Sequence, residues 1–257
     1  ELEMVACPSS GSCGGQFTAN TMACVSEAIG LAIPGSAGAP APYESRDEYA
    51  YASGETVMQA LKDKILPREI VTKKSLENAA RIVAATGGST NAGLHLPAIA
   101  HEAGIEFDLH DVGEIFRSTP YIADLKPGGK YVAKDMYDIG GVQVVIKELY
   151  ESGYIHGDCI TVNGKTIAEN LEKVKFPEDQ DVVYHVKKPL SETGGVVTLK
   201  GNLAPEGCIV KIAGMKKLHH KGPARVFDCE EDAFAAVQKL DYKEGDGIVI
   251  RYEGPIG

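Results

Sequence analysis

One cysteine near the start of the chain has the sequence surroundings of a metal ligand. Cys13 ends a stretch rich in glycine and serine, and Gly14 and Gly15 follow it directly. Apolar and small side chains then recur at helical spacing over residues 18–31. Backbone N–H groups and the helix dipole favour a thiolate over a thiol at the start of a helix, and a thiolate binds metals well. The two glycines leave room for a cluster or a substrate to approach the backbone.

The same residues are compatible with a reduced structural cysteine in a tight turn, and the spacing does not decide between the two. Cys7 and Cys13 are too widely spaced for a CxxC zinc knuckle, and no nearby histidine completes a set of four ligands. A zinc site made by this segment alone is therefore disfavoured. A cluster held partly by cysteines from elsewhere in the protein stays open.

A second segment could bind a carboxylate. Residues 87–91 read Gly-Gly-Ser-Thr-Asn and lead into a predicted apolar helix. N–H groups and hydroxyls at a helix start form a concave set of donors, so Ser89, Thr90 and Asn91 are candidate substrate-binding residues. An ordinary helix N-cap is the alternative. His95 is predicted to lie on the apolar face of this helix, as a core histidine rather than a ligand.

The cysteine segment resembles the third cluster-ligand motif of the dihydroxy-acid dehydratase and 6-phosphogluconate dehydratase family. Gln16 stands where that family has Met. The resemblance implies that Cys13 is a cluster ligand, whereas Cys7 and Cys24 have structural roles. The family motif reads Gly-x-Cys-x-Gly-Met-x-Thr-Ala-Asn-Thr-Met, and its matches here are Gly11, Cys13, Gly15, Thr18, Ala19, Asn20, Thr21 and Met22.

The resemblance continues through the last quarter of the chain. Residues 194–211 and 249–255 are similar to the opening strands of the family's C-terminal domain. Residues 201–207, which read Gly-Asn-Leu-Ala-Pro-Glu-Gly, favour the dihydroxy-acid branch. Cys208, inside an apolar run, is predicted to be a core residue.

The resemblance implies a hydro-lyase that eliminates water from 2,3-dihydroxy carboxylic acids to give 2-keto acids in isoleucine and valine (branched-chain amino acid) biosynthesis. The implied cofactors are an iron–sulfur cluster, 2Fe-2S in preference to 4Fe-4S, acting as a Lewis acid on the leaving hydroxyl, and a Mg ion holding the carboxylate. The family's serine base is expected beyond Gly257, so no catalytic residue is identified here. Both ends of the chain look cut, and we expect this polypeptide alone to be inactive.

Composition and charge restrict the partners. The chain carries 26 Lys and Arg against 36 Asp and Glu, and its formal net charge of -10 argues against a nucleic-acid partner. The chain contains no run of about 18 apolar residues, the length that a membrane-spanning helix needs. Six cysteines without a signal-peptide pattern fit reduced thiols in a cytoplasmic protein. The expected partner is a small dihydroxy-acid substrate, and the resemblance implies a homodimer of the full-length protein.

The expected fold class is α/β. We expect residues 1–190 to form the C-terminal part of a helix-rich α/β cluster-binding domain, and residues 191–257 to start a β-barrel-like C-terminal domain. Helices are predicted over residues 18–31, 46–64, 74–86 (with Thr72 and Ser75 as a start signal), 92–103, 108–116, 139–152 and 230–240, with a turn and a short helix within 155–171. Strands are predicted over residues 182–186, 196–199, 208–212, 224–227 and 248–252.

Two other functions stay open. A sugar-acid dehydratase acting on an aldonate or on 6-phosphogluconate would share the cluster and the eliminated groups. A non-catalytic module that senses small carboxylates through residues 87–91 would need no cluster at all. Replacing Cys13 with Ser separates the enzymes from the sensor, because a cluster enzyme loses colour and activity whereas a sensor is hardly affected.

Overall fold

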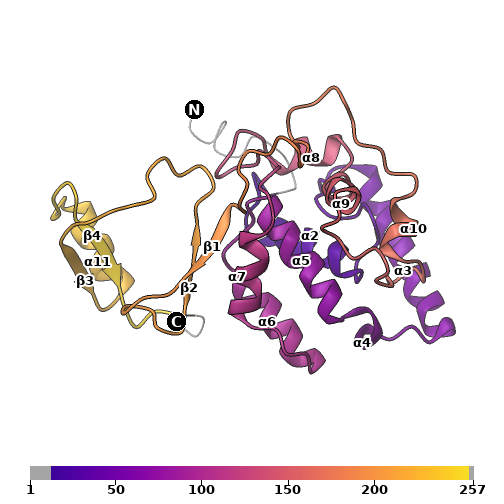
Figure 1. The fold of residues 1–257 in the computed structure, drawn as a ribbon, viewed down its shortest axis with the longest axis horizontal. Coiled ribbons are helices and arrows are strands. Elements are labelled where there is room, and N and C mark those ends of the chain that lie inside the picture. The colour runs from indigo at the N-terminus through magenta and orange to yellow at the C-terminus, as the bar shows by residue number, and fades with distance from the viewer. Residues whose placement is uncertain (1–12, 255–257) are drawn as a thin grey trace. The chain divides into compact units, whose positions relative to one another are not determined.

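The computed structural model describes residues 13–254, so Cys7 and Gly11 lie outside the described part of the chain. The chain forms two compact units, one that ends at Gly214 and one that begins at Met215. Figure 1 shows that helices dominate the first unit, whereas the second combines two strands with one helix. The chain therefore has the mixed α and β architecture that its sequence predicts.

The helices of the first unit surround one central member, α5 (Lys73–Ala85). Neighbouring helices lie on more than one side of α5 (Figure 1). Leu76, Ile82 and Val83 of α5 are fully buried, and each large aliphatic side chain contributes about 1.5–3 kcal/mol on burial. The other helices of residues 13–214 are α2 (Thr18–Ile29), α3 (Glu44–Asp63), α4 (Pro67–Ile70), α6 (Ala92–Ala103), α7 (Leu109–Arg117), α8 (Ala133–Asp138), α9 (Val142–Glu151) and α10 (Ile167–Leu171), and α2, α6, α7 and α9 are among those that pack on α5.

A β-hairpin completes the first unit. Its strands β1 (Val196–Leu199) and β2 (Cys208–Lys211) pair antiparallel, with Leu199 opposite Cys208. The hairpin packs on the middle of α7, where a Cβ atom added to Gly113 would lie 1.9 Å from the Thr198 hydroxyl oxygen. The hairpin can approach α7 so closely because position 113 has no side chain.

α3 is packed very differently from α5. It is 20 residues long, yet Ala60 is its one buried residue. Tyr51 and Leu61 are 72% and 68% exposed. At its first turn the Arg46 guanidinium donates a hydrogen bond of 2.7 Å to the carbonyl of Ala39. The N-terminal end of α3 is therefore joined to the preceding loop by a hydrogen bond.

The second unit is a β-α-β arrangement. Strands β3 (Ala224–Phe227) and β4 (Gly247–Ile250) pair in parallel, and α11 (Glu230–Gln238) connects them and contacts both. The two strands join into one sheet because a helix carries the chain back to the starting edge, as parallel pairing requires.

Glycines explain two differences between predicted and observed helix bounds. α2 ends at Ile29 because Gly30 adopts a left-handed φ of 99° and its N–H caps the last turn. α9 begins only at Val142 because Gly140 and Gly141 have φ values of 115° and 69°, which a right-handed helix does not allow. The helix predicted over residues 92–103 agrees with α6 at both ends.

The strand predicted over residues 182–186 is wrong. Val183 forms only an isolated bridge with Ala123, and both side chains are buried. The β-branched run therefore reflects burial between two extended segments and not a ladder of paired residues.

Two side chains predicted to lie in the core are more exposed than expected. The buried row of α6 contains Ala92 and Leu96, and His95 lies beside this row with its side chain in solvent. Cys208 is half-buried because it pairs with Leu199 at the end of the hairpin, where Leu199 is 52% exposed. The predictions for His95 and Cys208 are therefore wrong.

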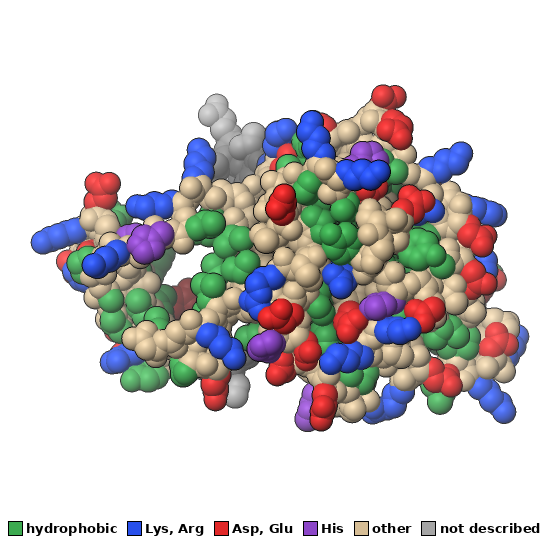
Figure 2. Space-filling model, viewed as in Figure 1, with side chains coloured by type: hydrophobic (Ala, Val, Ile, Leu, Met, Phe, Trp, Pro, Cys, Tyr) green, Lys and Arg blue, Asp and Glu red, His purple; other side chains and the backbone are tan. Residues whose placement is uncertain are grey.

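Surface chemistry agrees with the composition. On the face shown in Figure 2, acidic and basic side chains are interspersed, and the described residues form no broad basic area there. None of the helices described between residues 13 and 254 is both long and apolar enough to cross a membrane. The strands of these residues form two two-stranded sheets. The β-barrel-like domain and the boundary between residues 190 and 191 stay predictions.

Candidate functional site

Cys13 lies half-buried on the wall of a pocket of about 460 Å³. Residues 14–17 separate it from the start of α2, so the thiol does not lie directly at the helix end. Arg46 supplies positive charge to the pocket in an otherwise acidic chain, which suits an anionic ligand. The other lining residues come from one face of α2 (Ala19, Asn20, Ala23) and from the loop that follows α2 (Gly38, Ala39).

Gln16 anchors the turn that carries Cys13. Its side chain is fully buried. Its amide nitrogen donates to the Thr86 hydroxyl at 2.9 Å, and its amide oxygen accepts from the Asn20 side chain at 2.6 Å. Its backbone N–H donates to the carbonyl of Lys126 at 2.6 Å. A residue that departs from the family's Met is thus satisfied by hydrogen bonds at both ends of its amide.

Gly15 allows the same turn to lie against a second segment. A Cβ atom at Gly15 would come within 2.5 Å of the carbonyl oxygen of Lys126. Any larger residue at position 15 would push the Cys13 turn away from the segment that contains Lys126. From the sequence, Gly15 is expected to leave space for a ligand. In the structure, it leaves space for the backbone of Lys126.

The segment 87–91 contacts the start of α2. The Ser89 and Thr18 hydroxyl oxygens are 3.0 Å apart, and the Asn91 amide donates to the same Thr18 oxygen at 2.9 Å. The backbone N–H of Ser89 donates to the Thr21 hydroxyl at 3.0 Å. The structure therefore joins the two segments that the sequence singles out, through hydrogen bonds to the first turn of α2.

The three candidate substrate-binding residues are not equivalent. The side chains of Ser89 and Asn91 are engaged with Thr18, and the Asn91 side chain does not cap α6. Thr90 is half-buried, and its side chain makes no hydrogen bond to another described residue. None of the three lines the Cys13 pocket. Their role in substrate binding stays a prediction.

Burial distinguishes Cys13 from two other cysteines. Cys24 is fully buried, and burial raises the pKa of its thiol to about 12. Burial likewise raises the pKa of Cys159 to about 11. Neither buried thiol is suited to bind a metal as a thiolate at neutral pH. Within residues 13–254, no three His, Cys, Asp or Glu side chains come together as a metal site. Cys13, Cys208 and Cys229 are the described cysteines that are half-buried, and of these Cys13 alone lines the pocket with Arg46, so the described residues offer a cluster one thiol there and not a complete ligand set.

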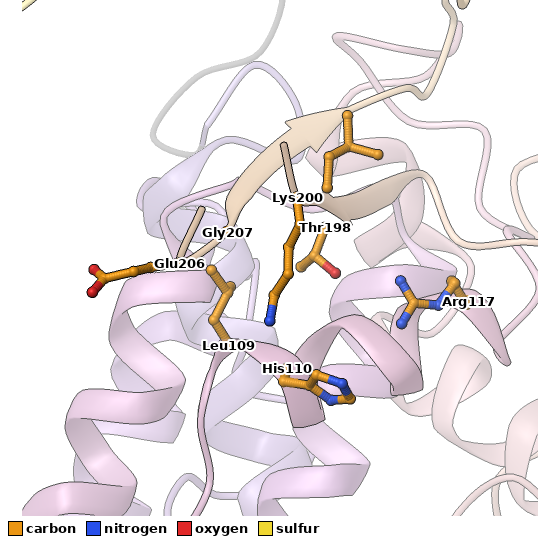
Figure 3. A pocket seen from close by; sticks show the side chains of 8 residues that line it. Leu109, His110, Arg117, Thr198, Lys200, Glu206 and Gly207 are labelled. Carbon is orange, nitrogen blue, oxygen red and sulfur yellow. The ribbon is translucent and has the colours of Figure 1, made fainter. Parts of the chain in front are cut away.

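A second pocket, of about 270 Å³, lies between α7 and the β-hairpin. Figure 3 shows Lys200, Arg117 and His110 around it. Arg117 already forms an ion pair with Glu114, and Lys200 is within electrostatic reach of the Asp108 carboxylate. These basic side chains are exposed, as Arg46 is. Arg117 is already paired with an acid, however, whereas Arg46 forms no ion pair with another described residue, so this pocket is a weaker candidate for an anion site than the Cys13 pocket.

Sequence reasoning missed the side of the pocket opposite α2. Gly38, Ala39 and Arg46 come from a loop and a helix start whose residues have no motif. The one available signal is the run of small residues between Pro34 and Pro42, which indicates a loop that can lie close to another element.

Comparison with known families identifies the class of protein. Residues 1–170 match the family described as dihydroxy-acid/6-phosphogluconate dehydratase N-terminal, and residues 181–257 match the corresponding C-terminal family. Together these matches cover nearly the whole chain. The chain belongs to the dihydroxy-acid/6-phosphogluconate dehydratase family.

Individual relatives agree with this assignment. The dihydroxy-acid dehydratase of Parvibaculum lavamentivorans is 69% identical over the whole chain, which covers 45% of that protein. The dihydroxy-acid dehydratase of Dinoroseobacter shibae is 70% identical with the same coverage, and that of Oceanobacillus iheyensis is 48% identical. The chain thus spans about half the length of the curated relatives that it matches.

Proposed function

We propose that the whole protein containing this chain is a hydro-lyase that eliminates water from 2,3-dihydroxy carboxylic acids and releases 2-keto acids. The relatives named dihydroxy-acid dehydratase, at 65–70% identity, support this substrate class. The corresponding pathway would be branched-chain amino acid biosynthesis. The observation that carries the proposal is the half-buried Cys13 on the wall of a pocket that also contains Arg46.

In this proposal Cys13 is one ligand of an iron–sulfur cluster, of the 2Fe-2S type. When bound, the cluster would polarise the leaving hydroxyl as a Lewis acid, and Mg would hold the substrate carboxylate. The remaining cluster ligands, the metal-binding carboxylates and the serine base would come from parts of the protein outside this chain. The single thiol at the pocket supports this division, because the described residues offer no second thiol beside it.

The chain's own residues have positioning and binding roles. Gln16 and Gly15 fix the turn that carries the thiol, through the contacts with Thr86 and Lys126. The Arg46 guanidinium is the group in the pocket that can attract an anionic substrate. We further propose that Ser89, Thr90 and Asn91 contribute to substrate binding. The half-buried hydroxyl of Thr90 and the amide oxygen of the exposed Asn91 make no hydrogen bond to another described residue, so both are available to a ligand.

The test is Cys13→Ser in the whole protein, with Cys208→Ser as the matched control. Cys208 is also half-buried but lies in β2 and lines neither pocket described above. The expected result for Cys13→Ser is loss of iron, of visible absorbance and of turnover of 2,3-dihydroxy-isovalerate, whereas Cys208→Ser retains all three. A Cys13→Ser protein that keeps its iron and its turnover overturns the proposal.

The same experiment separates the competing functions. Turnover of an aldonate or of 6-phosphogluconate in place of the dihydroxy-isovalerate would favour a sugar-acid dehydratase, which shares the family. Unchanged carboxylate binding after Cys13→Ser, with no iron in either protein, would favour a sensor. The chain's residues 201–207 and its relatives favour the dihydroxy acid.

Three further expectations belong to the whole protein. We propose that residues 1–190 complete a cluster-binding domain and that residues 191–257 begin a β-barrel-like domain. We propose a homodimer in the cytoplasm, on the basis of the family resemblance. Solution scattering of the whole protein measures the mass of the assembly, and a monomeric mass would contradict the dimer.

A further inference from the structure

One buried carboxylate lies on the same face of α2 as the pocket. Glu27 follows Asn20 and Ala23 at intervals of three and four residues, so the three side chains are on one face. Asn20 and Ala23 line the Cys13 pocket, and Glu27 lies one turn further along. The Glu27 side chain is 2% exposed.

Glu27 accepts hydrogen bonds with both of its oxygens. The backbone N–H of Gly35 donates at 2.8 Å, the backbone N–H of Ala37 at 2.5 Å, and the Gln143 amide of α9 at 2.5 Å. Two of these donors belong to the loop that follows α2. A carboxylate suits this arrangement because all three partners are donors.

The loop that Glu27 holds forms the pocket wall directly afterwards. Gly38 and Ala39 follow Ala37 and line the pocket. A Cβ atom at Gly38 would lie 3.3 Å from the Asn20 side-chain oxygen, so the loop is already close to the pocket face of α2. Asn20 and Glu27 are about two helical turns apart on α2, and the loop lies against the helix at both of these residues.

Burying a carboxylate at position 27 costs free energy, because the charged group loses its hydration. No Lys, Arg or His of the described chain forms an ion pair with Glu27, and burial raises its pKa to about 7 against the opposing effect of the three hydrogen bonds. A core position on a helix next to Ala28 and Ile29 would be filled at lower cost by an aliphatic side chain. An aliphatic side chain has no acceptor oxygens, whereas those of Glu27 accept hydrogen bonds from the backbone of the loop.

We propose that Glu27 is a positioning residue, whose carboxylate fixes residues 35–39 so that Gly38 and Ala39 form a wall of the pocket beside Cys13. Its consequence for catalysis rests on the proposed function, but the positioning itself does not. Without the carboxylate, the two backbone donors of the loop lose their partner and the wall separates from α2. Cys13 then becomes more accessible.

The test is the alkylation rate of Cys13 in the metal-free whole protein, followed by peptide mass spectrometry with iodoacetamide at a fixed pH of about 8, where free thiols react. The variant is Glu27→Gln, which keeps the size of the side chain but replaces one acceptor oxygen with an NH₂ group, a donor that faces other donors. The matched control is Glu148→Gln. Glu148 is also buried and also accepts from a distant backbone N–H, that of Val186, at 2.8 Å, but it lines no part of the pocket.

The expected result is a rise of about tenfold in Cys13 alkylation for Glu27→Gln, in line with the loss of hydrogen bonds to a charged group, and a change below about twofold for Glu148→Gln. A second variant, Gln143→Met, removes one donor and is expected to give a smaller rise. If circular dichroism shows that Glu27→Gln does not fold, the alkylation rate of the Gln143→Met protein tests the proposal in its place.

Equal rates in the wild type and in the Glu27 variant, or an equal rise in both glutamate variants, overturn the proposal. A kinetic readout distinguishes positioning from general loss of structure. In the iron-loaded protein, Glu27→Gln is expected to change the visible spectrum of the cluster and to raise KM, whereas Glu148→Gln leaves both unchanged. If Cys13 proves not to bind iron, the proposed function fails, while the alkylation comparison still decides the role of Glu27.

Discussion

The hydroxyl oxygens of Thr18 and Ser89 lie 3.0 Å apart and join the first turn of α2 to the bend between α5 and α6. The Thr18 oxygen also accepts from the Asn91 amide. One threonine thus ties the helix that follows Cys13 to two of the residues predicted to bind substrate. The two sequence motifs are parts of one hydrogen-bonded unit, although they are about 70 residues apart (separations of 71 and 73).

Thr18→Val is expected to destabilise the whole protein, because it leaves Asn91 and Ser89 without their shared partner. The expected loss is about 1–2 kcal/mol in the free energy of unfolding, measured by urea denaturation. Thr90→Val in the same bend is the control. Since the Thr90 side chain makes no hydrogen bond to another described residue, its replacement is expected to leave stability unchanged and to raise KM. Equal losses of stability in both variants would contradict this assignment.

Gly15→Ala is expected to displace the Cys13 turn. The added Cβ atom would lie 2.5 Å from the Lys126 carbonyl oxygen, which is shorter than van der Waals contact allows. The expected cost is about 1–3 kcal/mol in the free energy of unfolding, together with a lower iron content of the loaded protein. Gly54→Ala is the control, because nothing lies within 4 Å of the added atom and alanine favours the α3 helix. A neutral Gly15→Ala would show that the turn can shift freely.

Gln16→Met restores the residue that the family motif contains and is nevertheless expected to destabilise this chain. The Asn20 amide, which is 4% exposed, loses its acceptor. Leaving a buried donor unsatisfied costs about 1–3 kcal/mol. Gln59→Met on the exposed part of α3 is the control, since Gln59 bonds only the exposed Asp63. A Gln16→Met protein as stable as the wild type would mean that water or a rearranged Asn20 replaces the lost contact.

The pH dependence of stability is expected to reveal Glu27. Burial raises its pKa from 4.5 to about 7, so the folded state favours the protonated carboxyl. This contribution is fully present below pH 4.5 and is lost as the pH rises through 7, by roughly 3 kcal/mol for a shift of this size. The titratable neighbours Cys24 and Tyr49 have raised pKa values near 12 and stay neutral in this range. Urea denaturation at intervals between pH 4.5 and 8 measures the slope.

Glu27→Gln should remove this slope, because an amide does not titrate. The wild type is expected to lose stability across the interval, and the variant is expected to lose much less. A slope of the same size in both proteins would assign it to another group.

Local sequence rules predicted the helices well where the signals are local. The predicted start signal of α5 is confirmed, because the Thr72 oxygen accepts from the Ser75 N–H and the Ser75 hydroxyl accepts from the Thr72 N–H, and the helix begins at Lys73, one residue before the predicted start. The strand at residues 182–186 could not be excluded in this way. Whether a β-branched run forms a ladder depends on a partner strand, and the partner of Val183 is a single residue, Ala123.

The site, too, is predictable only in part, because one of its walls depends on tertiary contacts. The family motif indicated Cys13, and the contact between Thr18 and Ser89 joins its segment to the predicted bend. The opposite wall of the pocket depends on where the loop after α2 lies, and that follows from the buried Glu27 and from Arg46. Neither residue belongs to a motif, so their positions had to come from the tertiary structure.

The sparse packing of α3 has a consequence for the same pocket. With Ala60 as its one buried residue, α3 can open locally at a small cost in free energy, and its amide hydrogens will exchange with deuterium well before those of α5. Arg46 lies at the start of this helix. Opening of the first turn of α3 would break the hydrogen bond of 2.7 Å from the Arg46 guanidinium to the Ala39 carbonyl, so the exchange rate of this turn reports on the loop that lines the pocket.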